Sequence, residues 1–153
     1  MYVLSQGTEK SKDSKLTNPM NREIKFRARK ATGEWAYFRL DDLIGHASHV
    51  PTWVYEYPGL KKDQFIGLKD KDGNEIYEGD IVGVRTKNFT YKAVIALGWS
   101  ENGEYGWCQK RDGLSTIIRT VDFVDERYEI FGNIYENPDQ AKQIVMNKKT
   151  IHP

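Results

Sequence analysis

The chain has 153 residues, of which 29% are charged, 39% hydrophobic and 12% aromatic, and its formal net charge is +1. This aromatic content excludes a wholly disordered chain, and the near-neutral charge argues against a strongly basic nucleic-acid coat protein. The single cysteine, Cys108, excludes an intramolecular disulfide. No apolar stretch reaches the length of a membrane span. These features predict one soluble, cytoplasmic domain.

The two ends of the chain differ in composition from its centre. Residues 1–20 are mostly Ser, Thr, Lys, Asn and other polar residues, so burial cannot offset the entropy lost on ordering them. We therefore expect a flexible N-terminal extension over residues 1–20, a β domain over 21–147 and a disordered tail over 148–153. Without its ends, the body of the chain is slightly acidic.

The body opens with a period-two pattern that is typical of a strand. Apolar residues alternate with basic ones: Ile24, Phe26 and Ala28 against Lys25, Arg27 and Arg29. Because successive side chains of a strand point to opposite faces, the pattern predicts a buried apolar face and an exposed basic face. A turn over 30–34 then leads into a return strand from Trp35 to Phe38.

The next segments are less regular. Residues 41–44 predict a short helix or turn. Residues 45–59 contain two glycines and two prolines, which favour a long loop. Within this loop Trp53, Tyr55 and Tyr57 alternate, so we expect one short aromatic strand there.

From residue 64 onward, short strands alternate with glycine turns. Asp72-Gly73 is a tight-turn signal inside a strand–hairpin–strand segment over 64–86. Further strands are expected over 89–97, through Trp107, over 114–121 and over 128–135. Pro138 fits the first position of a helix with Asn137 as its N-cap. The spacing predicts a mainly-β fold of antiparallel strands that form a small, SH3-like barrel, with a short C-terminal helix.

One polar motif invites a calcium-loop interpretation. Asp70, Asp72 and Asn74 stand at alternating positions, but the glycine and glutamate of an EF-hand are missing from loop positions six and twelve. Aspartate, asparagine and glycine are also the favoured residues of tight turns. A hairpin turn is therefore the preferred interpretation.

The histidines and the cysteine likewise favour structural roles. His46 and His49 have no neighbouring ligands that would complete a zinc site, so a surface loop is expected. Cys108 stands in no recognisable nucleophile motif, and lone cysteines commonly behave as small buried hydrophobes. We predict no catalytic residues, no metal site and no cofactor.

The basic strand is the best candidate for a binding surface. It would combine cations with nearby aromatic rings, as small β-barrels do when they bind single strands. The alternative is a solvated strand face that discourages edge-to-edge pairing. The candidate binding residues are Lys25, Arg27, Arg29, Lys30, Trp35, Tyr37, Trp53 and Tyr55.

Three blocks in chain order resemble the YopX-like family of phage and prophage proteins: REIKFRAR (22–29), QFIGLKDKDGNEIYEGDIV (64–82) and IFGNIYENPDQ (130–140). Arg29 and Lys30 depart from the family, which commonly has a tryptophan and then an acidic residue at these positions. The resemblance implies a phage-encoded, β-rich domain. It carries over no catalytic or binding residues.

These observations lead to a functional hypothesis with one alternative. We expect a non-enzymatic, phage-encoded accessory protein in the cytoplasm of the bacterial host, which binds a host or phage macromolecule, with a protein partner favoured. Exposed aromatic and arginine side chains are suited to that role. The alternative is a small β-barrel that binds nucleic acid. No membrane partner is expected, and self-association through strand edges stays open.

Overall fold

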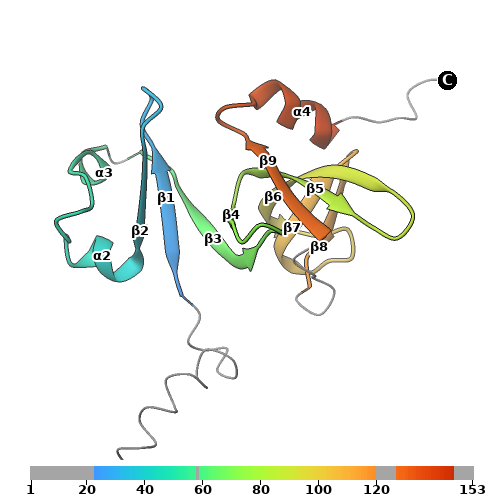
Figure 1. Cartoon of the computed structure of the whole chain (residues 1–153), viewed down its shortest axis with the longest axis horizontal. Helices are drawn as coiled ribbons and strands as arrows, with labels where there is room; N and C mark the ends of the chain where they lie inside the picture. Colours follow the sequence, from blue (N-terminus) through green and yellow to red (C-terminus); the bar gives the residue numbers. More distant parts are fainter. Residues whose placement is uncertain (1–22, 58, 120–126, 147–153) are drawn as a thin grey trace, which may run out of the picture.

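The computed structural model describes residues 23–57, 59–119 and 127–146. Within these ranges the fold is mainly β, with two antiparallel sheets and a short C-terminal helix (Figure 1). The expected N-terminal extension and C-terminal tail lie outside the described residues. In the described part of the chain, no helix is both long enough and apolar enough to cross a membrane.

The first sheet has four strands in the order β2-β1-β3-β4. Its strands are β1 (Lys25–Arg29), β2 (Trp35–Arg39), β3 (Lys62–Lys69) and β4 (Glu75–Tyr77). The predicted hairpin of β1 and β2 is confirmed, with Phe26 opposite Phe38. Because β1 also pairs with β3, it lies inside the sheet and not at its edge.

Two short helices cover one face of β1 and β2. They are α2 (Leu40–Ile44), where a short helix or turn was expected and a helix is found, and α3 (Trp53–Glu56). The segment from Trp53 to Tyr57 is therefore not the aromatic strand predicted from its alternation. A single helical turn lets the adjacent residues Trp53 and Val54 both pack into the cluster formed with Ala28 and Phe38.

The second sheet has five strands in the order β8-β7-β6-β5-β9. Its strands are β5 (Asp80–Arg85), β6 (Thr90–Trp99), β7 (Tyr105–Arg111), β8 (Leu114–Ile117) and β9 (Tyr128–Asn133). The helix α4 (Pro138–Met146) begins at the predicted proline and packs on Ile81 and Val94 through Ala141. The expected end of the strand over 114–121 lies partly outside the described residues.

The two sheets share a core where the first sheet's β3 and β4 meet the second sheet. Ile66 and Ile76 pack there against Val82, Val84 and Ile95. β4 and β5 follow each other in the chain, yet they belong to different sheets. No closed barrel is found among the described strands, so the SH3-like barrel is not confirmed.

The turn between β3 and β4 ties the first sheet to the second. Asp70 accepts hydrogen bonds at Oδ1 from the backbone N–H groups of Asp72 and Asn74, and at Oδ2 from that of Ile130 in β9. Burial alone would raise the pKa of Asp70, but these backbone donors hold it below its ordinary value. Gly73 has φ +85°, which supports the predicted hairpin turn.

Candidate functional site

Arg27 is the central residue of the candidate site, and the structure corrects its predicted exposure. It is 5% exposed, because side chains of the neighbouring strands of its own sheet and of the first residue of β5 enclose it. Its Nη2 lies 2.9 Å from Asp80 Oδ1, and its Nε lies 3.3 Å from Asp63 Oδ2. Conversely Ile24, expected in the core, is 42% exposed. The basic strand is therefore not a simple exposed cationic face.

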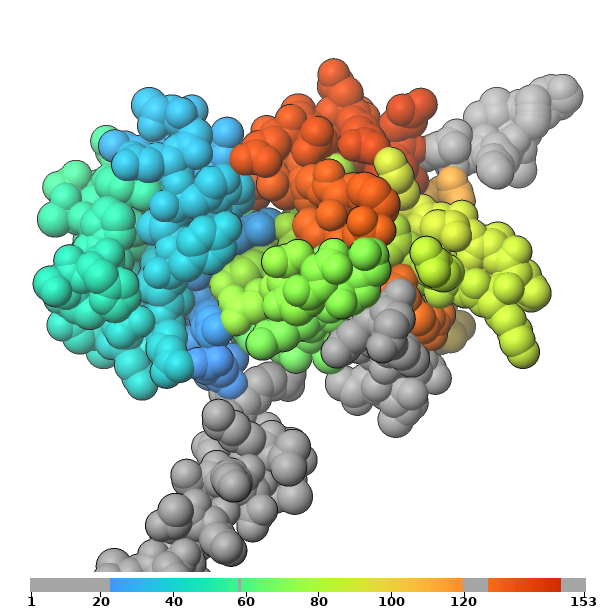
Figure 2. Space-filling model, viewed as in Figure 1, coloured from blue at the N-terminus to red at the C-terminus, as the bar shows by residue number. Residues whose placement is uncertain are grey.

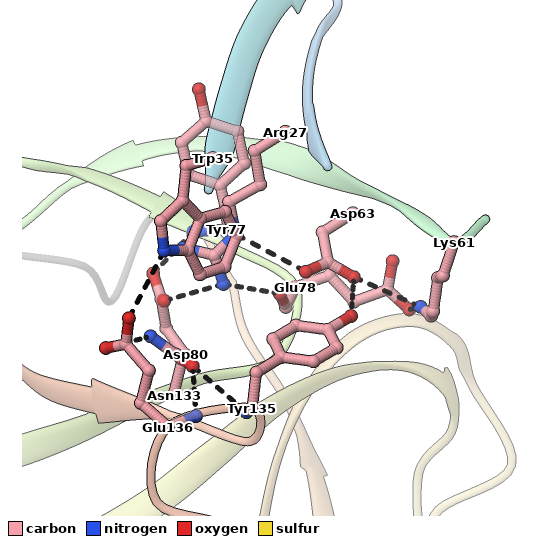
Figure 3. A network of polar contacts seen from close by, with 10 residues as sticks. All are labelled: Arg27, Trp35, Lys61, Asp63, Tyr77, Glu78, Asp80, Asn133, Tyr135 and Glu136. Atoms are coloured by element: carbon pink, nitrogen blue, oxygen red, sulfur yellow. Dashed lines mark hydrogen bonds and ion pairs between the residues drawn. The ribbon is translucent and has the colours of Figure 1, made fainter. Parts of the chain in front are cut away.

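A buried polar network extends from this ion pair across the two sheets (Figure 3). Asp63 of β3 accepts a 2.8 Å hydrogen bond at Oδ1 from the Tyr135 hydroxyl, and Lys61 Nζ lies 3.3 Å from the same oxygen. Arg27 also donates to the Glu78 carbonyl at 3.1 Å. The network thus links β1 and β3 of the first sheet to β5 and the segment after β9.

Aromatic rings surround the Arg27 guanidinium. Its Cζ lies 4.8 Å from the ring centroid of Trp35 and 4.9 Å from that of Tyr77, which is cation–π distance. Tyr37 stacks beside Trp35 and meets Tyr77 edge-on, and its own ring is 55% exposed. The Trp35 indole donates to Glu136 at 3.2 Å, which holds its ring over the junction of the sheets.

A cleft of about 580 Å³ opens beside this network. Figure 2 shows a hollow where the N-terminal part, the middle of the chain and the C-terminal part meet. Its wall includes Arg27, Tyr37, Lys69, Glu75, Tyr77, Asp80, Asn133 and Glu136. The cleft thus combines an exposed tyrosine at its rim with polar side chains along its wall.

Burial changes the proton affinity of three groups at this junction. It raises the pKa of Asp80 to about 6, and the charge of Arg27 opposes this shift without cancelling it. Burial, reinforced by hydrogen bonds to Glu75 and Asp63, raises the pKa values of Tyr77 and Tyr135 respectively. Both tyrosines therefore remain protonated donors at neutral pH.

The carboxylates that line the cleft are engaged by groups of the chain itself. Glu75 pairs with Lys25 and accepts a hydrogen bond from the Tyr77 hydroxyl. Asp80 accepts from the Tyr77 backbone N–H at 2.8 Å in addition to its pair with Arg27. Glu136 accepts from the side chains of Trp35 and Asn133. Such bonds fix the shape and the charge of the wall.

Four of the predicted binding residues come together near this cleft, and three do not. Arg27 and Tyr37 line the cleft, Trp35 packs against both of them, and Lys25 reaches the cleft residue Glu75. Lys30, Trp53 and Tyr55 lie instead with the helical cluster. There the Lys30 ammonium is 5.7 Å from the Trp53 ring centroid, and the Tyr55 hydroxyl donates to the Leu43 carbonyl.

Arg29 occupies a position between these two groups. Its Cζ lies 5.8 Å from the Trp35 ring centroid. Its Nε is buried and, among the described residues, has no hydrogen-bond partner. Arg29 therefore supports the outer side of Trp35 and does not reach the cleft itself.

Several residues of the site carry no signal that sequence reasoning could use. Asp63, Asp80 and Glu136 are three of 22 acidic residues, and nothing in their spacing separates them from the rest. Tyr77 and Tyr135 read as ordinary strand residues. Their common feature is a partner that lies far away in the chain. Asp63, Asp80 and Tyr77 contact Arg27, Tyr135 contacts Asp63, and Glu136 contacts Trp35.

The histidines and the cysteine occupy sites of a different kind. His46 stacks on Tyr55, and His49 lies 3.3 Å from Asp42 on the helical side. Cys108 is fully buried, as expected for a small hydrophobe. Across residues 23–57, 59–119 and 127–146, no three His, Cys, Asp or Glu side chains are grouped as metal ligands.

Comparisons with known proteins identify the family of this chain. A structure described as the crystal structure of protein EF1440 from Enterococcus faecalis is 24% identical, with 82% of this chain and 84% of that chain covered and a TM-score of 0.38. No curated protein matches the chain. The family model described as YopX protein matches residues 10–141, which is most of the chain. The chain therefore belongs to the YopX family.

Proposed function

We propose that this protein is a non-enzymatic, phage-encoded accessory protein that binds a protein partner through the cleft between its two sheets. Its place of action would be the cytoplasm of the bacterial host. The observation that carries the proposal is the aromatic edge of the cleft, where the 55% exposed Tyr37 is held by Trp35 and Tyr77. Rigid aromatic side chains beside arginine are typical anchors of protein interfaces.

The charges of the first strand favour a protein partner over nucleic acid at this site. Arg27 is neutralised by Asp63 and Asp80, and Lys25 by Glu75. Phosphate binding depends on cations that can exchange counterions for phosphate, and these cations are already paired within the protein. The charged residues of the cleft wall are Arg27 and Lys69 against Glu75, Asp80 and Glu136, so their sum is negative and disfavours a phosphate backbone.

The engaged carboxylates support a binding role for the cleft. A general acid or base must exchange its proton with a substrate, whereas Glu75 and Glu136 each accept two hydrogen bonds or ion pairs from the chain itself. These hydrogen bonds and ion pairs hold the carboxylates of the cleft wall in fixed positions. A preformed surface of this kind lowers the entropic cost of holding a partner.

The test is affinity purification from host cells that carry the phage, with nuclease added to remove nucleic acid. Tyr37→Ala should lower the recovery of a specific protein partner by about tenfold, as expected for truncation of an interface anchor. Tyr57→Ala is the matched control, because Tyr57 is 52% exposed and belongs to the helical side. Loss of the partner on nuclease treatment, or equal loss in both variants, would contradict the proposal.

A further inference from the structure

The outer face of the second sheet is covered at one end and open at the other. α4 packs over Ile81 and Val94. Beyond them, β5, β6 and β9 leave a shallow depression of about 50 Å³ around Gly83, with Arg85, Glu129 and Phe131 in its lining. This open end carries an aromatic ring and several cations, so it differs chemically from the cleft.

A β-bulge places Phe131 on this surface. Ile81 lies opposite Gly132 and Val82 opposite Ile130, so Phe131 is the extra residue of β9 at that point. Its ring lies across Gly83, where a Cβ atom would have no room, and is 49% exposed. Bulges commonly re-aim a side chain, and here the bulge and the glycine together present a flat aromatic ring to solvent.

Cations lie around that ring. The Lys92 ammonium is 4.9 Å from the ring centroid of Phe131, and Lys71, Arg85 and Arg127 line the same depression. Within the described part of the chain, neither Arg85 nor Lys92 lies within 4.0 Å of a carboxylate oxygen. Lys71 contacts Asp72, and Arg127 donates to the Arg85 carbonyl.

Among the residues that the structure describes, the local charge of this surface is positive, although the chain as a whole is close to neutral. Lys71, Arg85 and Lys92 stand there against Glu129 in the depression and Asp72 at its margin. Such a patch attracts a polyanion, and an exposed ring beside it can stack with any nucleobase. We name Lys71, Arg85, Lys92, Arg127 and Phe131 the Phe131 patch.

The geometry points to the Phe131 patch as a binding site for single-stranded nucleic acid. A base stacks on the Phe131 ring in place of the Lys92 ammonium, which lies over that ring in the free protein. Lys92 then moves to a flanking phosphate, and Arg85 contacts another. A duplex is disfavoured, because its bases are already stacked on one another. The site is separate from the proposed protein-binding cleft: Ile130 and Gly132 of β9 line the cleft, whereas Glu129 and Phe131 line the patch.

The first experiment separates stacking from phosphate contact. Fluorescence anisotropy of the full chain is measured with a labelled oligothymidylate of about twelve nucleotides, and with an abasic strand of the same length. Phe131→Ala should weaken binding of the oligothymidylate by about tenfold and leave that of the abasic strand unchanged. Phe131→Trp should retain binding, and Tyr57→Ala is the control for an exposed ring elsewhere.

The second experiment tests the cations through salt dependence between about 50 and 200 mM. Lys92→Gln and Arg85→Gln should each reduce the slope of log affinity against log salt by about 0.7, as expected for one lost single-strand phosphate contact. Lys142→Gln, at an exposed position of α4 without an ion pair among the described residues, should leave the slope unchanged.

Three results would overturn this assignment. They are the absence of oligothymidylate binding at low salt, equal binding of the oligothymidylate and a duplex of the same length, and an unchanged affinity in Phe131→Ala. If Phe131→Ala does not fold by circular dichroism, Phe131→Leu takes its place, because leucine fills the space over Gly83 without offering a stacking ring. The Phe131 variants should still recover the protein partner in the affinity purification. Failure of the nucleic-acid site can therefore be distinguished from failure of the protein-binding cleft.

Discussion

Arg27 combines a full positive charge with almost complete burial. Its two carboxylate partners, Asp63 and Asp80, are 1% and 2% exposed. Bringing these three groups out of water is costly, and their mutual attraction offsets that cost only while all of them are present. The stability of the junction between the sheets therefore depends on this one side chain.

Arg27→Gln should destabilise the protein by about 3 kcal/mol or more, because it leaves two buried carboxylates without their shared cation. Arg39→Gln makes the same change at an exposed position of the neighbouring strand, where the pair with Glu23 contributes about 1 kcal/mol at most. Urea unfolding of both variants measures the difference. Equal losses in the two variants would show that the buried pairs do not stabilise the fold.

Asp80 should make stability depend on pH in the acid range. Burial raises its pKa to about 6 from an ordinary 3.8, so the folded state holds the proton more tightly than the unfolded chain. The stabilisation that the folded state gains by holding this proton is fully present below pH 3.8 and is lost as the pH rises through about 6. The free energy of unfolding of Asp80→Asn, relative to the wild type, should therefore increase by roughly 2 kcal/mol between pH 4 and pH 7. Parallel urea-unfolding curves at every pH would contradict this.

In the turn between β3 and β4, the backbone conformation of one glycine should contribute to stability. Gly73 has φ +85° and no atom within 4 Å of where a Cβ would lie, so any cost of substitution comes from the backbone and not from a clash. Gly73→Val should cost about 1 kcal/mol or more, and Gly73→Asn less, because asparagine tolerates positive φ. Thermal denaturation of the two variants tests this order, and equal losses would rule out the backbone explanation.

Elements defined by neighbouring residues were predictable from the sequence. Asp72-Gly73 marks its hairpin, and Pro138 marks the start of α4, because turn and helix signals act over a few residues. The segment beginning at Trp53 was not predictable in this way. Its alternating aromatics favour a strand, yet the adjacent Trp53 and Val54 both pack against the first sheet, which stabilises a helical turn.

The candidate site was predictable only in part, for a reason that concerns elements far apart in the chain. Trp35 and Tyr37 were identified from their place beside the basic strand. The alternation of β1 correctly separates Arg27 from Phe26 and Ala28, but it does not reveal that side chains of β2, β4 and β5 enclose Arg27. That information lies in the pairing of Arg27 with Asp80, which follows from tertiary packing. The prediction that Lys25, Arg27 and Arg29 share one exposed face was therefore wrong.

At the scale of the whole molecule, the two sheets are joined by an apolar core and by the Arg27 network. Ile66 and Ile76 pack on the second sheet, while Asp63 and Asp80 hold Arg27 between the sheets. The two contacts are chemically different but serve the same junction. A partner that binds in the cleft would therefore contact both sheets at once, through Tyr37 on one side and Asn133 on the other.

The position of β9 in the second sheet has a kinetic consequence. β5 to β8 pair with their neighbours in the chain, whereas β9 returns to pair with β5, the first strand of this sheet. Closing that long loop costs more entropy than closing a hairpin, so β9 should dock after the folding transition state. The junction residue Tyr135, which follows β9, would then reach Asp63 last.

Chevron analysis would reveal this order. Ile130→Ala in β9 should mainly accelerate unfolding, by about tenfold for a loss of about 1.4 kcal/mol, and leave the folding rate nearly unchanged. Ile95→Val in β6, within the hairpins, should instead slow folding. A slower folding rate for the Ile130 variant would place β9 in the nucleus. If β9 docks late, the strand that contributes Ile130 and Gly132 to the cleft and Phe131 to the Phe131 patch is the last to join its sheet. A chain in which β9 has not yet paired with β5 therefore lacks both proposed binding surfaces.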